Sequence, residues 1–213
     1  MIGIIDYGMG NLRSVQKAFE AAGQTAKLTQ DPEEIQSFAG LVLPGVGAFG
    51  KAMENLNDLG LVPAIQNYIQ AKKPFLGICL GLQLLFTASE ESFGGEAISG
   101  LDIIAGRVVK FPPDLKIPQI GWNQIIANKE SRLLKGVSRQ AYVYFVHSYY
   151  VRPQNPSVTL TTTEYGISFV SSIALNNVYA IQFHPEKSST VGLKILSNFG
   201  AIIAKGENEV DVG

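Results

Sequence analysis

The segment PFLGICLGLQLLF, residues 74–86, points to the fold class because it joins a strand pattern to a helix pattern through a tight G-x-C-x-G turn. Residues 74–79 form a short apolar run, which predicts a buried strand. Residues 80–90, LGLQLLFTASE, predict a helix that follows the strand directly. A continuous apolar strand that leads into a helix is typical of a parallel sheet with helices on both faces.

The residues before this stretch show the same alternation. Strands are predicted at 2–6, 25–29 and 40–45, and helices at 11–23 and 48–72. The second of these helices should consist of two pieces, broken near Gly60 and Pro63.

The second half of the chain has a different pattern, with strand-like runs separated by turns before a final predicted helix at 189–204. These runs are GRVVKF, IGWNQIIA, AYVYFVHSYYV, SVTLTTT, FVSSIAL and VYAIQF. We expect one α/β domain, residues 1–204, in which a mainly parallel, helix-covered central sheet carries an antiparallel flank. The polar tail, 205–213, is expected to fray.

Composition excludes several classes of protein. Hydrophobic residues make up 46% of the chain and charged residues 16%, which suits a sizeable core. The net charge of −1 gives no reason to expect a nucleic acid or an anionic membrane as partner. A single cysteine cannot form an internal disulfide, and no apolar run reaches the length of a membrane span. Since we also find no signal-peptide pattern, we expect a cytoplasmic protein.

Cys79, the single cysteine, allows two interpretations. Free cysteine is often only a small buried hydrophobic residue. The pattern Gly77-Ile78-Cys79-Leu80-Gly81 between a strand and a helix, however, is the cysteine version of a nucleophile elbow. There the helix N-terminus favours a thiolate, and the N–H of Leu80 would face an oxyanion on a bound substrate.

The chain has two histidines that could act as the base for such a nucleophile. For His147, in YFVHSYY, a hydrogen-bonded structural role is the leading interpretation. His184 ends a strand-like run, at the sheet edge where α/β proteins place their ligands. Pro185 favours an extended His184, so that Glu186 could lie on the same side and orient the imidazole. The alternative for Glu186 is an exposed acid in the first turn of a helix.

A second glycine pattern, GVGAFG at 45–50, matches the dinucleotide motif G-x-G-x-x-G. The acidic residue that the motif requires at the end of the next strand is absent, because that strand ends at Cys79. We therefore interpret Gly45, Val46 and Gly47 as a source of backbone N–H groups beside the Cys79 turn.

With these pieces together, the sequence resembles the class I (triad) glutamine amidotransferases, which have a flavodoxin-like fold. Within that class it is most similar to the glutaminase subunits of imidazole glycerol phosphate synthase, over residues 1 to about 204. The motifs that carry the resemblance are DYGMGNLRSV (6–15), PGVGAFG (44–50), GICLGLQLLF (77–86), GWN (121–123), YFVHSYY (144–150) and QFHPEKS (182–188).

The resemblance implies a glutaminase with a Cys79–His184–Glu186 triad and neither a cofactor nor a metal. Cys79 would form a γ-glutamyl thioester, and the oxyanion would meet the N–H of Leu80 and of the loop Gly45–Gly47. The residues implied for glutamine binding are Gln83 and Glu91, on the predicted helix, and His147, Ser148 and Tyr149. Two of them have alternative roles that do not involve substrate. Gln83 could serve only as a cap for local backbone, and Glu91 could be a solvated charge at a helix end.

The resemblance also implies a partner, the (β/α)8-barrel cyclase subunit that receives the ammonia in histidine biosynthesis. The implied interface residues are Asn11, Trp122, Asn123 and Lys187, with core filler as the alternative for Trp122. Three other functions stay possible: a glutaminase subunit of another amidotransferase such as pyridoxal phosphate synthase, a stand-alone γ-glutamyl hydrolase, and a non-catalytic flavodoxin-like module in which Cys79 is part of the core.

Overall fold

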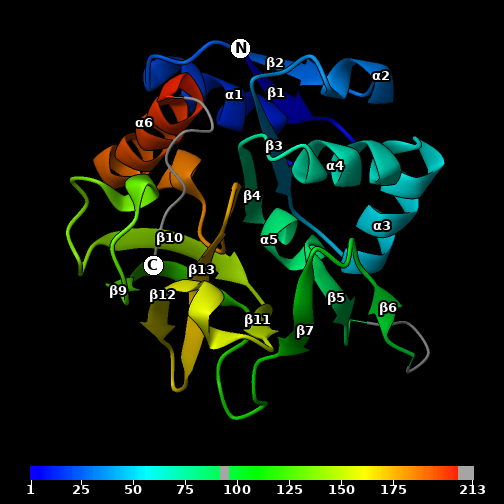
Figure 1. Cartoon of the computed structure of the whole chain (residues 1–213). Helices are drawn as coiled ribbons and strands as arrows, with labels where there is room; N and C mark the ends of the chain where they lie inside the picture. Colours follow the sequence, from blue (N-terminus) through cyan, green and yellow to red (C-terminus); the bar gives the residue numbers. More distant parts are fainter. Residues whose placement is uncertain (92–95, 206–213) are drawn as a thin grey trace.

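The computed structural model describes residues 1–91 and 96–205, and its centre is a parallel sheet (Figure 1). Five strands pair in parallel in the order β2 (Ala26–Thr29), β1 (Ile2–Ile5), β3 (Gly40–Gly45), β4 (Phe75–Cys79) and β14 (Val178–Ile181). Every strand predicted in the first half is present within two residues of its expected bounds. The predicted fold class is therefore confirmed.

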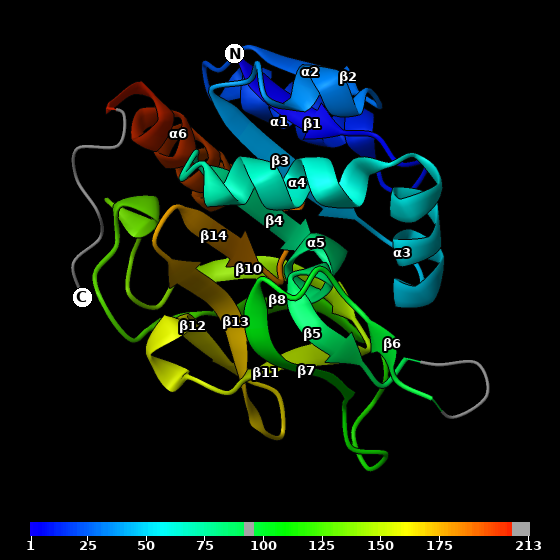
Figure 2. The same ribbon diagram turned by 45° about the vertical axis from the view of Figure 1, so that its right-hand side comes forward.

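Helices cover both faces of this sheet, as the continuous apolar strands predict (Figure 2). One face packs against α1 (Leu12–Ala21) and α6 (Ser189–Lys205), and the other against α3 (Phe49–Asp58) and α4 (Leu61–Gln70). Along β4 the side chains alternate, so that Leu76 and Ile78 join the first core and Phe75 joins the second. Full burial of such side chains is worth about 1.5–3 kcal/mol each, which ties both helical layers to the sheet.

The antiparallel flank continues the same sheet beyond β14. Its strands are β13 (Ser168–Leu175), β11 (Tyr149–Pro153), β7 (Ile104–Lys110), β5 (Phe86–Ser89) and β6 (Ile98–Ser99), with β12 (Thr159–Glu164) and β9 (Ile126–Ala127) attached to β13. A separate sheet pairs β8 (Gln119–Gln124) with β10 (Tyr142–His147). Short helical turns complete the described chain: α2 (Pro32–Ile35), η1 (Arg132–Leu134), η2 (Pro156–Val158) and η3 (Pro185–Lys187).

The prediction of a helix over 80–90 is wrong in its second half. The helix α5 ends at Leu84, and β5 follows, pairing in parallel with β7. The run LGLQLLF is apolar on every side and buried throughout α5, so its periodicity cannot separate a buried helix from a buried strand. The predicted break between the two helices lies at Gly60, whose φ of 64° is left-handed, whereas Pro63 sits in the first turn of α4.

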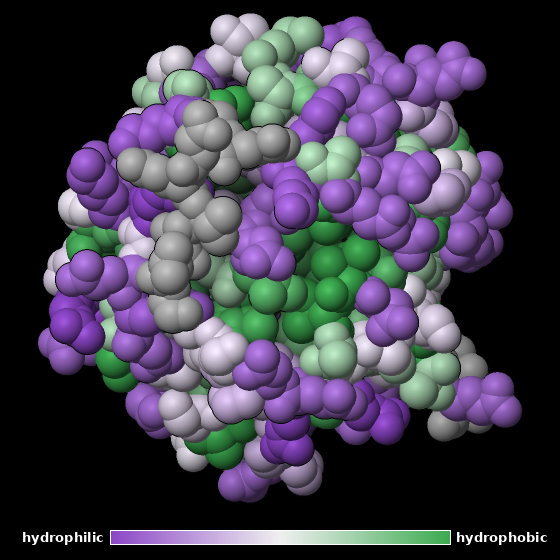
Figure 3. Space-filling model, viewed as in Figure 1, coloured by the Kyte–Doolittle hydropathy of each residue, from purple (hydrophilic) through white to green (hydrophobic). Residues whose placement is uncertain are grey.

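One face of the molecule is mostly hydrophilic. Figure 3 shows this face, with a hollow of hydrophobic residues near its centre. Within residues 1–91 and 96–205, no helix has the length and hydrophobicity needed to cross a membrane. The predicted fraying of the tail concerns residues that, apart from Lys205 at the end of α6, lie outside the described ones.

The sheet brings three distant segments of sequence to one edge. Strands β3, β4 and β14 are neighbours, with Gly45 opposite Cys79 and Ile78 opposite Ile181. Their carboxyl ends therefore lead into the glycine loop, the cysteine turn and the segment that holds His184. Open parallel sheets bind their ligands at this edge.

Candidate active site

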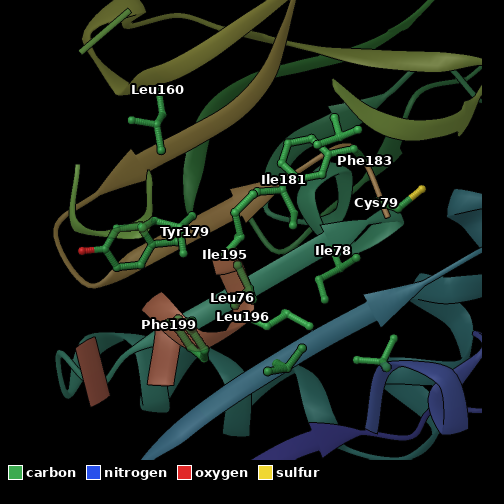
Figure 4. Packing of buried hydrophobic residues seen from close by; sticks show 14 of the residues in the cluster. Leu76, Ile78, Cys79, Leu160, Tyr179, Ile181, Phe183, Ile195, Leu196 and Phe199 are labelled. Carbon is green, nitrogen blue, oxygen red and sulfur yellow. The ribbon is translucent and has the colours of Figure 1, made fainter. Parts of the chain in front are cut away.

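Cys79 occupies a strained turn between β4 and α5. Its φ of 55° and ψ of −105° are unusual for a residue with a side chain. The flanking glycines make the turn possible, because a Cβ on Gly77 would lie 2.7 Å from the Gly81 carbonyl oxygen and a Cβ on Gly81 would overlap the Leu43 carbonyl. Figure 4 shows the Cys79 sulfur at the end of β4, pointing away from the labelled core residues. The geometry matches the predicted nucleophile elbow.

His184 and Glu186 form the predicted pair. The Nδ1 atom of His184 lies 2.8 Å from Oε1 of Glu186, and the two side chains are only 3% and 2% exposed. Burial lowers the pKa of His184, but the charge of Cys79, a hydrogen bond with Cys79 and the contact with Glu186 together raise it to about 10. The ring lies between Cys79 and the Glu186 carboxylate, and its raised pKa favours the imidazolium form.

The route by which Glu186 reaches the ring differs from the prediction. His184 is extended, as Pro185 requires, but residues 185–187 form the 3₁₀ turn η3. The alternative of an exposed first-turn acid is wrong, since the carboxylate is buried against the imidazole. Ser188, which the sequence did not single out, fixes this turn: its hydroxyl donates to the His184 carbonyl at 2.6 Å and accepts from the Tyr144 N–H at 3.0 Å.

A pocket of about 430 Å³ opens over Cys79. The residues that line it include two of the loop, Val46 and Gly47, and Leu80 at the start of α5. Gly45 stays in β3, paired with Cys79, and Gly47 has a φ of 99° that favours glycine. The predicted glutamine-binding residues line the same pocket: Gln83, Glu91, His147, Ser148 and Tyr149.

Gln83 and Gln182 form a buried amide chain behind the sulfur. The Gln83 amide nitrogen donates to the Tyr149 carbonyl at 3.0 Å and to Oε1 of Gln182 at 3.1 Å. The Gln182 amide nitrogen in turn donates to the Cys79 sulfur at 3.7 Å. Sequence reasoning missed Gln182, although its position in QFHPE, two residues before the base, was the available signal.

Glu91 lies after β5 rather than on a helix. Its Oε2 atom accepts a hydrogen bond from the Phe49 N–H at 2.9 Å, at the first residue of α3. A carboxylate there is stabilised by the helix dipole. The simple solvated charge that the sequence left open is therefore wrong, since this carboxylate is bound within the pocket wall.

His147 has the surroundings of a structural histidine. Nδ1 lies 2.8 Å from the Tyr149 carbonyl and Nε2 lies 3.0 Å from the side-chain amide of Gln119. Burial, opposed by the Tyr149 bond and aided by the charge of His184, lowers the pKa of His147 to about 4. The neutral ring donates from Nδ1, so Nε2 is an acceptor and the Gln119 amide must turn its NH₂ group toward it.

The predicted interface residues occupy different surroundings. Trp122 on β8 is 54% exposed, so the core-filler alternative is wrong. The Lys187 ammonium lies 5.6 Å from the centre of the Tyr144 ring, and Asn11 is exposed just before α1. Asn123 is tied to β12, because its amide donates to the Glu164 carbonyl at 2.9 Å.

Trp122 is part of a larger apolar face that the sequence did not reveal. Ile120 and Tyr142 are 62% and 57% exposed, and the register of β8 with β10 places both on the same side as Trp122. We call these three residues the β8–β10 apolar face.

Comparison with known proteins gives consistent results. The profile of the family described as "Glutamine amidotransferase class-I" matches residues 3–203. The chain is 56% identical to "Imidazole glycerol phosphate synthase subunit HisH" of Aquifex aeolicus, covering 92% of this chain and 94% of that one. It is 52% identical to the protein of the same description from Caldanaerobacter subterraneus, covering 95% and 98%.

Solved structures resemble the chain in fold. "Structure of PurLQS from Thermotoga maritima" matches with a TM-score of 0.73 and 14% identity, covering 96% of this chain and 97% of that one. "Crystal structure of glutamine amidotransferase" matches with a TM-score of 0.72 and 17% identity, covering 93% and 98%.

Proposed function

The chain belongs to the glutamine amidotransferase class-I family, and we propose that it is the glutaminase subunit of imidazole glycerol phosphate synthase in histidine biosynthesis. The relatives at about half identity over nearly the whole chain favour this function over a glutaminase subunit of another amidotransferase such as pyridoxal phosphate synthase. The cytoplasm, where a single thiol stays reduced, is its proposed location.

One observation supports the chemistry most strongly: Cys79 lines the pocket, and His184, from a distant part of the sequence, bonds to Cys79 on one side and to the buried Glu186 on the other. The buried Nε2 atom of His184 forms no hydrogen bond to nitrogen or oxygen within residues 1–91 and 96–205. It is therefore free to exchange a proton with the sulfur and with a substrate.

The reaction follows from this arrangement. The Cys79 thiolate attacks the side-chain amide carbon of glutamine, and the carbonyl electrons move onto the oxygen. The N–H of Leu80 and an N–H of the 45–47 loop stabilise this oxyanion. When the C–N bond breaks, the His184 imidazolium gives its proton to the departing nitrogen, which leaves as ammonia. His184 then removes a proton from water, which attacks the thioester, releases glutamate and restores the thiolate.

Substrate orientation uses charge and backbone around the pocket. Glu91 supplies a carboxylate for the α-ammonium group of glutamine, held in place by its bond to the Phe49 N–H. Ser148 and Tyr149 follow β10 and hold the α-carboxylate. The neutral His147 contributes by fixing the Tyr149 carbonyl rather than by exchanging protons.

The partner is a (β/α)8-barrel cyclase on a separate chain, forming a heterodimer through which ammonia passes without release. The β8–β10 apolar face supports this proposal, because exposed aromatic residues are typical anchors of interfaces. We expect the isolated chain to be nearly inactive, since the 45–47 loop can present either an N–H or a C=O to Cys79 and the partner would select the active arrangement.

The test is a glutaminase assay on the purified chain with and without the cyclase and its nucleotide ligand. Wild type should hydrolyse glutamine rapidly only in the ligand-bound complex, and Cys79→Ala should be inactive in every condition. A stand-alone γ-glutamyl hydrolase would instead show full activity without the cyclase. If a glutamine-mimicking electrophile fails to label Cys79 in the complex, the non-catalytic interpretation holds.

A further inference from the structure

Tyr7 carries a buried hydroxyl group that the proposed mechanism leaves unused. Its side chain is 1% exposed, and within residues 1–91 and 96–205 the hydroxyl has no hydrogen-bond partner. The backbone beside it is fixed, since the Asn55 amide donates to the Tyr7 carbonyl at 3.0 Å. A buried hydroxyl without a partner is destabilising, which points to a hydrogen bond formed in another arrangement of the chain.

The hydroxyl lies against the loop that faces the nucleophile. A Cβ added to Gly45 would overlap the Tyr7 oxygen and lie 3.0 Å from the Leu80 Cβ. Gly45 is the β3 residue paired with Cys79. Tyr7 therefore packs on the α-carbon from which the 45–47 loop departs, within the electrostatic field of the sulfur.

The protonation state makes this group a donor. Burial, and secondly the negative charge of Cys79, raise the pKa of Tyr7. The phenol stays neutral through the physiological range and can give one hydrogen bond. The segment that this hydroxyl contacts begins at Gly45, so the carbonyl groups of the 45–47 loop are the candidate acceptors.

A peptide group also couples the two sides of the loop. Its N–H and C=O point in opposite directions, so a rotation that aims an N–H at Cys79 aims the carbonyl of the same peptide away from the sulfur. In the active arrangement of the loop, the carbonyl that faces away from Cys79 therefore needs a hydrogen-bond donor.

We propose that Tyr7 is a positioning residue, whose hydroxyl binds a carbonyl of the 45–47 loop when an N–H of that loop turns toward Cys79. The hydroxyl is then unpaired in the isolated chain because its hydrogen bond forms only in the active complex. This inference rests on the proposed glutaminase function and adds a residue to its oxyanion site.

Tyr7→Phe separates this role from a structural one, because it removes the hydroxyl and keeps the ring. In the isolated chain we expect Tm to stay equal or rise by roughly 2 °C, since an unsatisfied polar group is lost. In the ligand-activated complex we expect kcat for glutamine to fall about tenfold with KM unchanged, since one hydrogen bond of the active loop is lost.

Tyr68→Phe is the matched control. Tyr68 is also fully buried with a pKa raised by burial, but its hydroxyl donates to the Phe38 carbonyl at 3.2 Å. This variant should lower Tm and leave kcat at the wild-type value. A wild-type kcat in Tyr7→Phe, or a fall in Tm like that of Tyr68→Phe, would overturn the proposal for Tyr7 alone. A wild-type complex without glutaminase activity would overturn the proposed function, and the role of Tyr7 with it.

Discussion

The two histidines occupy equally buried but chemically opposite regions. His184, at the carboxyl edge of the parallel sheet, is 2% exposed between a thiol and a carboxylate, and its pKa is raised to about 10. His147, on the inner face of the β8–β10 sheet, is 6% exposed and has a pKa lowered to about 4. Its neighbours are dipoles and the rings of Phe111, Phe145 and Phe169, with centroids 5.2–5.6 Å away.

Burial disfavours the charged ring in both places, so the counter-charge decides which histidine becomes an imidazolium. The charged His184 ring, beside sulfur, can exchange protons with a substrate. The neutral His147 ring, bonded to a carbonyl and an amide, instead holds the backbone at Tyr149 in place. Substitutions that remove either ring or change its neighbours test this division.

The largest effect is expected when each ring is removed in turn. His184→Asn should lower kcat of the activated complex by at least about 10⁴-fold, because the thiol loses its base, with little change in Tm. His147→Phe should cost about 1–3 kcal/mol of stability, because the Gln119 amide loses its buried partner. Glutaminase assays and thermal unfolding of both variants check this, and a larger loss of kcat in His147→Phe would reverse the two assignments.

The next effect concerns the charge on Glu186. Glu186→Gln keeps the size and a hydrogen-bonding oxygen but removes the negative charge beside His184. We expect kcat to fall about 10³-fold, because the imidazolium formed in the reaction loses its counter-charge. The control Glu164→Gln alters an exposed acid on β12 and should leave kcat unchanged. Wild-type activity in Glu186→Gln would show that this carboxylate is only structural.

A smaller change should give His147 the surroundings of His184. Gln119→Glu places a carboxylate against Nε2 and should raise the pKa of His147 above its wild-type value of about 4, measured by NMR. In wild type the unfolded chain binds this proton more readily than the folded chain. The free energy of unfolding therefore falls as pH drops from 6.5 to about 4, and the substitution should weaken that loss. An unchanged titration would mean that Gln119 does not control the ring.

The smallest effect on the isolated chain is expected on the outer face of the same strands. Trp122→Ala should change the free energy of unfolding by less than about 0.5 kcal/mol, because the ring is mostly exposed. Affinity for the cyclase should fall roughly 30-fold, the loss of an interface anchor worth about 2 kcal/mol. Calorimetry with the cyclase checks the second value, and unchanged affinity would move the interface elsewhere.

The features that could be predicted from sequence are those with local causes. The G-x-C-x-G turn depends on glycines next to Cys79, and the extended His184 depends on Pro185, so both were accessible. The strand–helix alternation of the first half likewise follows from short apolar runs and from Gly60.

The missed features depend on partners far along the chain. Gln182 reaches a sulfur 103 positions away, and the Ser188 hydroxyl meets a backbone N–H 44 positions away. The end of α5 at Leu84 is set by pairing of β5 with β7. The exposure of Ile120 and Tyr142 depends on which face of an aromatic-rich strand pair meets the core, and both faces are apolar enough to do so.

An NMR titration of both imidazoles in wild type and Cys79→Ala would show whether Cys79 controls the charge on His184. His184 should remain protonated up to a pH of about 10 in wild type and should lose its proton at lower pH in the variant, while His147 stays neutral down to about 4 in both. A His184 ring that titrates near 6.5 in wild type, or that titrates alike in the two proteins, would contradict the pairing of sulfur, imidazole and carboxylate at one site.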